Sequence, residues 1–285
     1  MGSLYNPLFI YKKRKAVMKR ISEIPYNVIW SFIYGLISKG FVCHKDYEKL
    51  IEFKGIHTGK IGFLMGNGPS VVMQDLEKIS RMDNIVTFAA NRIHLVYDQS
   101  EYRPDYVISS DEQVIKDFGQ EIINANKGYK VFFASFFKNT TLMGDYVWIK
   151  LKNGRPFKFS EKIQKKVMSG GGSLNVALQI GYYMGIREFY LYGVDHDFNF
   201  EKSDKNSEYE AKGDDNHFIK NYRSGRAWQA PRSELIEETF IKLDKKLRTE
   251  GGKLINSTHG GKLEVLKRIP LNEVFEMYNY TIDNK

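Results

Sequence analysis

Short apolar runs alternate with longer segments of helical periodicity from residue 60 to residue 256. The runs have the length of buried strands, and in the segments between them apolar residues recur at the spacing of a helix turn. The predicted strands are residues 61–65, 85–90, 106–109, 130–135, 146–151, 187–192 and 253–256. A chain that alternates strand and helix in this order builds a mainly parallel sheet with helices on both faces.

The length and composition of the chain allow one large domain with an appendage. The 285 residues are 42% apolar and 14% aromatic, which is enough to bury a sizeable core. We predict a basic amphipathic helical appendage over residues 1–58. Residues 59–285 are predicted to form a Rossmann-like α/β nucleotide-binding catalytic domain. Residues 198–230 are polar without a clear apolar period, and we interpret them as a lid.

The first part of the chain combines cations with an apolar stretch. Lysine and arginine dominate residues 12–20, and residues 28–43 are apolar but interrupted by serine, glycine and lysine. The stretch is too short and interrupted for a spanning helix, and it lacks the cleavage site of a secretory signal. Residues 12–43 therefore fit either peripheral contact with a membrane or packing on the protein, including packing in a homo-oligomer.

Charge and cysteine content limit the compartment and the partners. The single cysteine, Cys43, cannot form an internal disulfide, which fits a reducing compartment. We expect a cytoplasmic protein, with peripheral contact at the inner face of the cell membrane. The net charge of +9 suits an anionic substrate, membrane or nucleic acid. Because zinc-finger and aromatic RNA-binding signatures are missing from the sequence, we expect no nucleic-acid partner.

A glycine-rich loop follows the first predicted strand. It consists of Gly66, Asn67, Gly68, Pro69 and Ser70. Glycines let a phosphate approach the backbone, and the start of the next helix offers unpaired N–H groups. We expect the loop to hold a nucleotide phosphate, with Asn67 reaching a ribose or phosphate and Ser70 capping the helix. The alternative is a tight turn with a structural role.

A second glycine-rich loop precedes the helix predicted after residue 172. It contains Ser169, Gly170, Gly171 and Gly172. Consecutive glycines are costly to order, so they indicate that another group comes close to the backbone. We expect a second anion site here, and a flexible hinge is the alternative.

Polar side chains follow three further predicted strands. Asp195 and Asp197 follow strand 187–192, Asp111 follows strand 106–109, and Asn91 follows strand 85–90. Ligands of such sheets bind beyond the carboxyl ends of the strands. Carboxylates placed there can bind sugar hydroxyls or a divalent metal, and Asn91 can contact a base or sugar. The alternative for the aspartates is helix capping or a turn.

Two histidines are candidates for a general base. His217 lies in the predicted lid, and His259 follows the last predicted strand. Imidazole is the usual base for a hydroxyl group at neutral pH. The sequence leaves the choice between them open.

These motifs resemble glycosyltransferase family 42, the bacterial sialyltransferases that use CMP-sialic acid. The similar segments are residues 66–70, 169–170, 177–195 and 216–218. A wider group is similar over about residues 53–275, including residues 103–106, 193–196 and 260–265. That group contains the archaeal 6-hydroxymethylpterin diphosphokinase and bacterial proteins linked to surface-polysaccharide assembly.

The resemblance to the sialyltransferases implies roles for individual residues. The nucleotide would be held by Asn67, Gly68, Asn91, Ser169 and Gly170. Asp195 would lie beside the donor. His217 would deprotonate the acceptor hydroxyl for an inverting displacement that needs no cofactor or metal.

The sequence also departs from family 42 at phosphate contacts. Asp197 stands where the family has a tyrosine, residues 110–111 stand where it has an asparagine, and Lys166 is the nearest match to an arginine. We expect lid residues to supply the missing phosphate contacts. These residues are Tyr222, Arg223 and Arg226.

Three hypotheses for the function follow. The first is a glycosyltransferase that moves a sialic-acid-like or related sugar from a nucleotide-activated donor, CMP-linked by preference, to a surface-glycan or lipid-linked glycan acceptor. The second is a pyrophosphokinase that uses ATP and magnesium, with Asp111, Asp195 and Asp197 as metal ligands. The third is a nucleotide-binding protein without catalysis in a polysaccharide complex.

Overall fold

The computed structural model describes residues 28–29, 31–33, 45–128, 130–198, 208–210, 216–220, 222, 227–229 and 231–278. Its strands are β1 (Ile61–Met65), β2 (Ile85–Ala90), β3 (Tyr106–Ser109), β4 (Val131–Ser135), β5 (Tyr146–Lys152), β6 (Val167–Met168), β7 (Glu188–Tyr192), β8 (Glu208–Glu210), β9 (Ala227–Gln229) and β10 (Lys253–Asn256). Its helices are α3 (Lys45–Glu52), α4 (Met73–Ser80), α5 (Glu112–Ala125), α6 (Ser173–Tyr183), α7 (Ser233–Arg248) and α8 (Leu271–Met277), with the short 3₁₀ helix η1 (Ile93–Val96).

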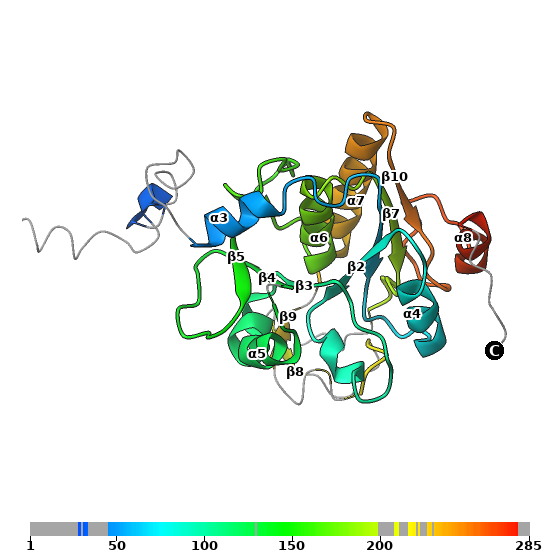
Figure 1. Ribbon diagram of the computed structural model, residues 1–285, viewed down its shortest axis with the longest axis horizontal. Coiled ribbons are helices and arrows are strands. Elements are labelled where there is room, and N and C mark those ends of the chain that lie inside the picture. The colour runs from blue at the N-terminus through cyan, green and yellow to red at the C-terminus, as the bar shows by residue number, and fades with distance from the viewer. Residues whose placement is uncertain are drawn as a thin grey trace, which may run out of the picture.

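One parallel sheet organises the molecule. Its order is β10-β7-β1-β2-β3-β4-β5-β6, and each neighbouring pair is parallel. Helices α3, α6 and α7 cover one face, and α4, α5 and α8 cover the other (Figure 1). The predicted α/β fold, with a mainly parallel sheet and helices on both faces, is therefore confirmed.

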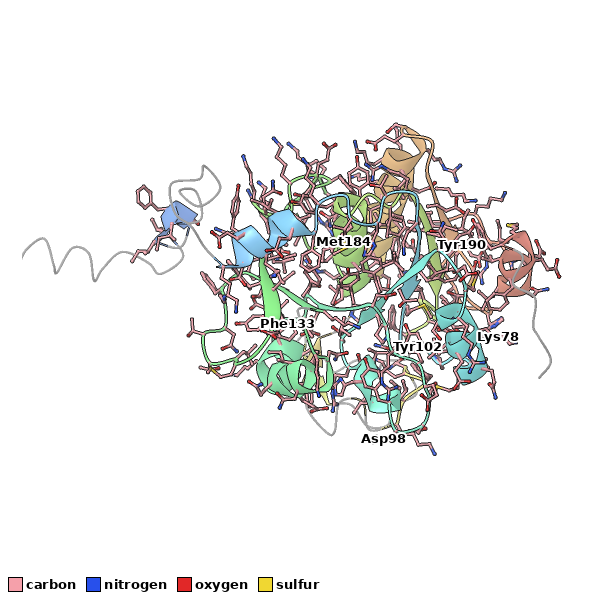
Figure 2. The ribbon with its side chains drawn as sticks, viewed as in Figure 1. Lys78, Asp98, Tyr102, Phe133, Met184 and Tyr190 are labelled. Carbon is pink, nitrogen blue, oxygen red and sulfur yellow. The ribbon has the colours of Figure 1, made fainter. Side chains whose placement is uncertain are left out.

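Both faces of the sheet are buried. Successive residues of a strand point to opposite faces, so Leu64 belongs to the core under α6 and α7 whereas Phe63 belongs to the core under α4 and α5. Figure 2 shows side chains filling both layers, with Met184 on the α6 side and Phe133 on the α5 side. Burial on both faces explains why the strands are continuous apolar runs in the sequence.

The predicted strands all occur, with bounds that agree within a residue. Three strands were not predicted from the sequence: β6, β8 and β9, which have two or three residues each. Such short strands are too brief to show a periodic pattern. β8 and β9 pair antiparallel inside the segment that we interpreted as a loop-like lid, so that part of the interpretation is corrected.

The predicted Ser70 cap of α4 is wrong, and the serine at the start of α7 does not cap its helix either. α4 begins after Val72 and α7 after Arg232, and neither of these residues caps its helix with a side chain. Ser70 lies before α4 in the chain, and its hydroxyl donates to the Asp195 carboxylate instead. Ser233 is the first residue of α7 rather than the residue that precedes it.

Part of the segment expected as an appendage lies against the sheet. Leu50 of α3 is buried in the core under α6, and the Phe53 ring contacts the rings of Tyr106 and Phe132. The described residues before α3 are the helical residues 28–29 and 31–33, whereas residues 12–20 and Cys43 lie outside the described residues. None of the helices in the described part of the chain is long and apolar enough to cross a bilayer.

The chain changes direction between β1 and β7. These strands are neighbours, but the chain continues from β1 toward β2 and from β7 toward β10, on opposite sides. In open parallel sheets, ligands bind beyond the carboxyl ends of the strands at such a switch point. The loops after β1 and β7 are therefore the place to look for a site.

Candidate functional site

A cavity of about 510 Å³ lies at the carboxyl edge of the sheet. The loops after β1, β2, β3 and β7, the start of α6, and residues of α7 and of segment 216–222 form its wall. The predicted site residues that line it are Gly66, Asn67, Gly68, Asn91, Asp111, Ser169, Gly171, Asp195, Asp197, His217 and Tyr222. Pro69, Ser70 and Gly170 are not among the lining residues, and Arg223 and Arg226 lie outside the described residues. The volume suits a small-molecule ligand.

The first glycine loop uses its amides within the protein. The hydrogen bonds are Gly66 N to Tyr192 O (2.8 Å), Gly68 N to Gly193 O (3.0 Å) and Ser70 N to Asp195 Oδ1 (3.2 Å). A Cβ atom on Gly68 would overlap Asp195 Oδ2, so the close approach of the loop after β7 requires the glycine. These amides are committed to protein acceptors, which corrects the expectation that they are free for a phosphate.

The second glycine loop turns the N-terminal end of α6 toward the cavity. Gly171, Gly172 and Ser173 line the cavity, and the N-cap residue Gly172 has no side chain to cap the helix. Gly171 has a φ of 91°, and a Cβ atom there would lie 2.9 Å from Ile236 Cγ1 of α7. Packing against α7 therefore accounts for this glycine. The first N–H groups of α6 carry the partial positive charge of the helix, which favours an anion in this part of the cavity.

Asn91 ties the ends of β2 and β3 to the start of α6. Its Oδ1 atom accepts hydrogen bonds from Ser109 Oγ (2.8 Å) and Ser173 Oγ (3.1 Å). Ser173 Oγ also accepts a hydrogen bond from Ser110 N (2.9 Å). Asn91 adopts a left-handed φ of 53°, a conformation in which asparagine is enriched. The network fixes the position of the α6 terminus relative to the sheet.

The predicted carboxylates all line the cavity, and each has a partner of its own. Asp111 Oδ1 caps α5 by accepting from Gln113 N (2.9 Å) and Val114 N (3.1 Å). Asp197 pairs with Lys262 Nζ at 2.7 Å, and Asp195 Oδ2 accepts from Ser70 Oγ at 2.8 Å. Burial raises the pKa of Asp195, and the hydrogen bonds from Ser70 counteract part of that effect.

The three predicted aspartates do not form one cluster of metal ligands. In the part of the chain that the structure describes, no group of three or more His, Cys, Asp or Glu side chains is arranged to hold one. The ligand set of Asp111, Asp195 and Asp197 that the kinase hypothesis requires is therefore not formed. Asp111 is a helix cap, as the structural alternative predicted.

His217 lies on the cavity wall against Tyr222. The two rings stack with centroids 3.8 Å apart and planes at 11°. The backbone of the segment is fixed beside the imidazole, because Phe218 N donates to Asn67 O at 3.1 Å. Ile219 and Tyr222 are buried in the core under α4 and α5. The segment that carries the histidine is therefore docked on the body of the protein.

Asn67, Arg92 and Tyr222 form the anchor of that segment. Asn67 Nδ2 donates to Tyr222 Oη (3.0 Å) and to Ala90 O (2.8 Å). The backbone N–H of Arg92 donates to Tyr222 Oη (3.3 Å). The Arg92 guanidinium donates to the Tyr222 carbonyl oxygen and, at 2.9 Å, to Glu121 Oε1. The Tyr222 hydroxyl thus accepts two hydrogen bonds within the protein, and 2% of the residue is exposed. Its expected role as a phosphate contact stays a prediction.

Two further histidines are resolved near the site. His196 lines the cavity, is 9% exposed and has a left-handed φ of 54°. Its Nε2 atom lies 3.0 Å from Glu237 Oε1. His259, the sequence alternative to His217, bonds to Asp75 at 2.8 Å and is not among the residues that line the cavity. The cavity therefore brings His196 and His217 together, and not His259.

Several residues of the site carried no usable signal in the sequence. Arg92 follows Asn91 directly, but its partner Tyr222 is 130 residues away in the sequence, so the sequence does not reveal that the two residues are in contact. Glu237 lies on α7, where a glutamate is ordinary on the exposed side. Only the tertiary arrangement reveals such partners.

Comparison with known proteins places the chain in a family. The family model described as "6-hydroxymethylpterin diphosphokinase MptE-like" matches residues 38–201. Among solved structures, the chain is similar to the MAf glycosyltransferase from Magnetospirillum magneticum AMB-1, with a TM-score of 0.48 and 16% identity over 80% of this chain. It spans 38% of that glycosyltransferase. None of the curated proteins compared with the chain matches it. Because the family model covers more than half of its residues, the chain belongs to the 6-hydroxymethylpterin diphosphokinase MptE-like family.

Proposed function

We propose that the chain is a glycosyltransferase that moves a sugar from a nucleotide-activated donor, CMP-linked by preference, to a hydroxyl group of a glycan acceptor. One observation carries the proposal. A single cavity at the carboxyl edge of the sheet is lined by the first residues of α6, by Asp195 and by His217. These are the parts that a displacement at a sugar phosphate needs: an anion site, a carboxylate beside the donor and a base.

The donor phosphate is assigned to the start of α6. The amides of the loop after β1 already donate to protein acceptors, whereas α6 lacks a side-chain cap and its first residues line the cavity. A helix terminus stabilises the negative charge that develops on a departing nucleotide phosphate. This assignment replaces the phosphate site that the sequence suggested for the loop 66–70.

His217 is assigned as the base. In the proposed reaction its imidazole takes the proton of the acceptor hydroxyl, and the acceptor oxygen attacks the anomeric carbon of the sugar. The bond from that carbon to the phosphate oxygen breaks, and its electron pair leaves with the nucleotide. The Tyr222 ring behind the imidazole and the Phe218 to Asn67 bond support this role, because they hold the base in a fixed orientation.

The base is tested by turnover of CMP-sialic acid, followed as release of CMP. We expect His217→Ala to lower kcat by about 100-fold or more, the usual contribution of a general base, and to leave CMP binding unchanged. His259→Ala is the matched control, because His259 pairs with Asp75 away from the cavity wall. If His196→Ala stops turnover and His217→Ala does not, the assignment of the base is wrong.

Family membership supports a second candidate, an ATP-dependent diphosphokinase. Such an enzyme positions phosphates mainly with magnesium, and the predicted aspartate ligands do not assemble into a metal site. A thermal-shift panel of CMP, CDP, UDP, GDP and ATP, each with and without magnesium, separates the candidates. The glycosyltransferase predicts a shift with CMP that survives EDTA, whereas stabilisation by ATP with magnesium alone would favour the kinase. A CMP shift without turnover would favour a nucleotide-binding protein that lacks catalysis.

A further inference from the structure

Residues 150–166 present a strip of cations beside the cavity. The exposed ones are Lys152, Arg155, Lys158, Lys162, Lys165 and Lys166. Glu161 is the single acidic residue of this stretch in the sequence, and it pairs with Lys246 of α7 at 2.6 Å. Within the described ranges none of the exposed cations of the strip forms an ion pair, whereas cations elsewhere, such as Lys262 and Arg187, pair with carboxylates.

Two cations of the strip, Lys152 and Lys166, act electrostatically on Lys150. Lys150, at the start of the strip, has a pKa lowered first by burial and then by the charges of Lys152 and Lys166. Unpaired like charges in one place are unfavourable for the folded protein alone. An anionic surface that neutralises them removes that repulsion.

An apolar helical turn lies next to the strip. Lys150 Nζ donates to Ser31 Oγ at 3.1 Å. Val28 and Phe32, on the same turn as Ser31, are 53% and 67% exposed. Exposed apolar side chains beside a group of lysines are the combination that peripheral proteins use at anionic membranes, where the apolar groups enter the headgroup region and the cations attract the lipids.

Protection of a sheet edge explains only part of the strip. Lysines on an edge strand prevent pairing with another sheet, and β6 is the edge strand here. However, β6 consists of two buried residues, Val167 and Met168, and Lys158, Lys162 and Lys165 belong to the loop between β5 and β6. The charge therefore extends well beyond what guarding the edge requires.

We propose that the cation strip of residues 150–166 and the apolar turn at Val28 and Phe32 form a docking surface for an anionic phospholipid membrane. The surface adjoins the cavity, because Leu151 and Asn153 belong to the cavity wall. Docking holds the cavity mouth beside the lipid headgroups, where a lipid-linked substrate is presented. The proposal does not rest on the assignment of glycosyl transfer.

Vesicle sedimentation tests the surface. The full chain is mixed with vesicles of phosphatidylcholine alone or of phosphatidylcholine with phosphatidylglycerol, at low and high salt. We expect binding to the anionic vesicles only, weakened by salt. The triple variant Lys152→Glu, Lys158→Glu, Lys165→Glu should lose affinity by roughly 100-fold, because each lysine near an anionic surface contributes about a fivefold factor.

Two further variants make the test specific. The control Lys116→Glu, Lys127→Glu, Lys130→Glu changes the net charge equally and should bind nearly as the wild type does. Its exposed lysines are Lys116 of α5, which lies on the other face of the sheet from α3, and Lys127 and Lys130 between α5 and β4. Phe32→Ser should lower affinity roughly tenfold at both salt concentrations. Circular dichroism confirms that each variant is folded.

Three outcomes would overturn the proposal. Equal binding to vesicles with and without the anionic lipid would remove the role of the strip. Equal losses of vesicle affinity in both triple variants would mean that binding depends on the net charge of the protein and not on the strip. Absence of vesicle binding by the wild type would rule out the membrane surface, and it would leave the proposed function untouched.

Discussion

Gly68 and Gly172 lie beside the same cavity under very different constraints. A Cβ atom on Gly68 would overlap Asp195 Oδ2 and lie 2.7 Å from its Cγ atom. A Cβ atom on Gly172 would meet no atom within 4 Å, and the extended φ of −172° at that residue suits any side chain. The first glycine is needed for contact between two loops, whereas the second leaves room at the end of a helix.

This difference predicts that two alanine substitutions change the stability of the protein by different amounts. Gly68→Ala should lower the free energy of unfolding by about 1–3 kcal/mol, because the Asp195 loop must move away. Gly172→Ala should change it by about 0.5 kcal/mol or less. Urea unfolding of both variants measures the difference, and equal losses would mean that the contact between the loops after β1 and β7 is not as close as described.

The Asp195 carboxyl predicts a pH dependence of stability. Burial raises its pKa above the 3.8 of an ordinary aspartate, so the folded protein holds the proton more tightly than the unfolded chain. Its contribution to the free energy of unfolding therefore falls as the pH rises from the unfolded value through the folded value. Asp195→Asn removes this dependence.

The expected result is a variant that gains stability relative to the wild type between acid and neutral pH. Urea unfolding at a pH below the ordinary aspartate pKa and at neutral pH measures the change. Asp197→Asn is the control, because Asp197 is exposed and paired with Lys262 on the surface. A wild type that gains stability relative to Asp195→Asn as the pH rises would show that the hydrogen bonds from Ser70 outweigh burial.

At the scale of elements, segment 216–222 is held by a few long-range contacts. Tyr222 Oη accepts hydrogen bonds from the Asn67 amide and the Arg92 backbone, and the tyrosine ring lies behind His217. The rest of the predicted lid contributes β8 and β9 to the described structure. The anchor at Tyr222 therefore determines where the candidate base lies relative to the cavity.

Tyr222→Phe should release this segment. The substitution leaves buried donors without an acceptor, which costs about 1–3 kcal/mol, and we expect faster proteolysis near residues 216–222 together with lower turnover. Tyr97→Phe is the matched control, since the Tyr97 hydroxyl donates to Asn126 Oδ1 at 2.7 Å and neither residue lines the cavity. The anchor would be refuted if both variants lost stability equally and retained the same proteolysis pattern and turnover.

At the scale of the whole molecule, the sequence predicted the sheet because burial on both faces leaves continuous apolar runs such as residues 61–65 and 187–192. It also placed Asn91 and Asp195 at the edge where the cavity lies, since parallel strands end at a common edge. His217 was a candidate as a residue of the predicted lid and through the family resemblance, with His259 as the alternative. The sequence could not predict that Asp195 accepts a hydrogen bond from the Ser70 hydroxyl, or that Tyr222 accepts one from the Arg92 backbone. Those contacts join residues that only the folded chain brings together.

The roles of the glycines were also beyond the sequence. A glycine needed for a phosphate and one needed for a neighbouring loop look the same in a sequence. A Cβ atom at Gly68 would overlap Asp195, and one at Gly171 would crowd Ile236, so protein packing explains these two glycines. We therefore propose the anion site at the start of α6 rather than in the first loop, because Gly172 leaves that helix without a side-chain cap.

Nucleotide binding by Gly172→Asp tests this central claim most directly. An aspartate at the N-cap position stabilises a helix and places a negative charge where the phosphate is assigned. We expect Gly172→Asp to have a slightly higher melting temperature than the wild type and no shift with CMP, whereas the uncharged cap Gly172→Asn keeps the CMP shift. A full CMP shift in Gly172→Asp would contradict the assignment of the nucleotide phosphate to the N-terminal end of α6.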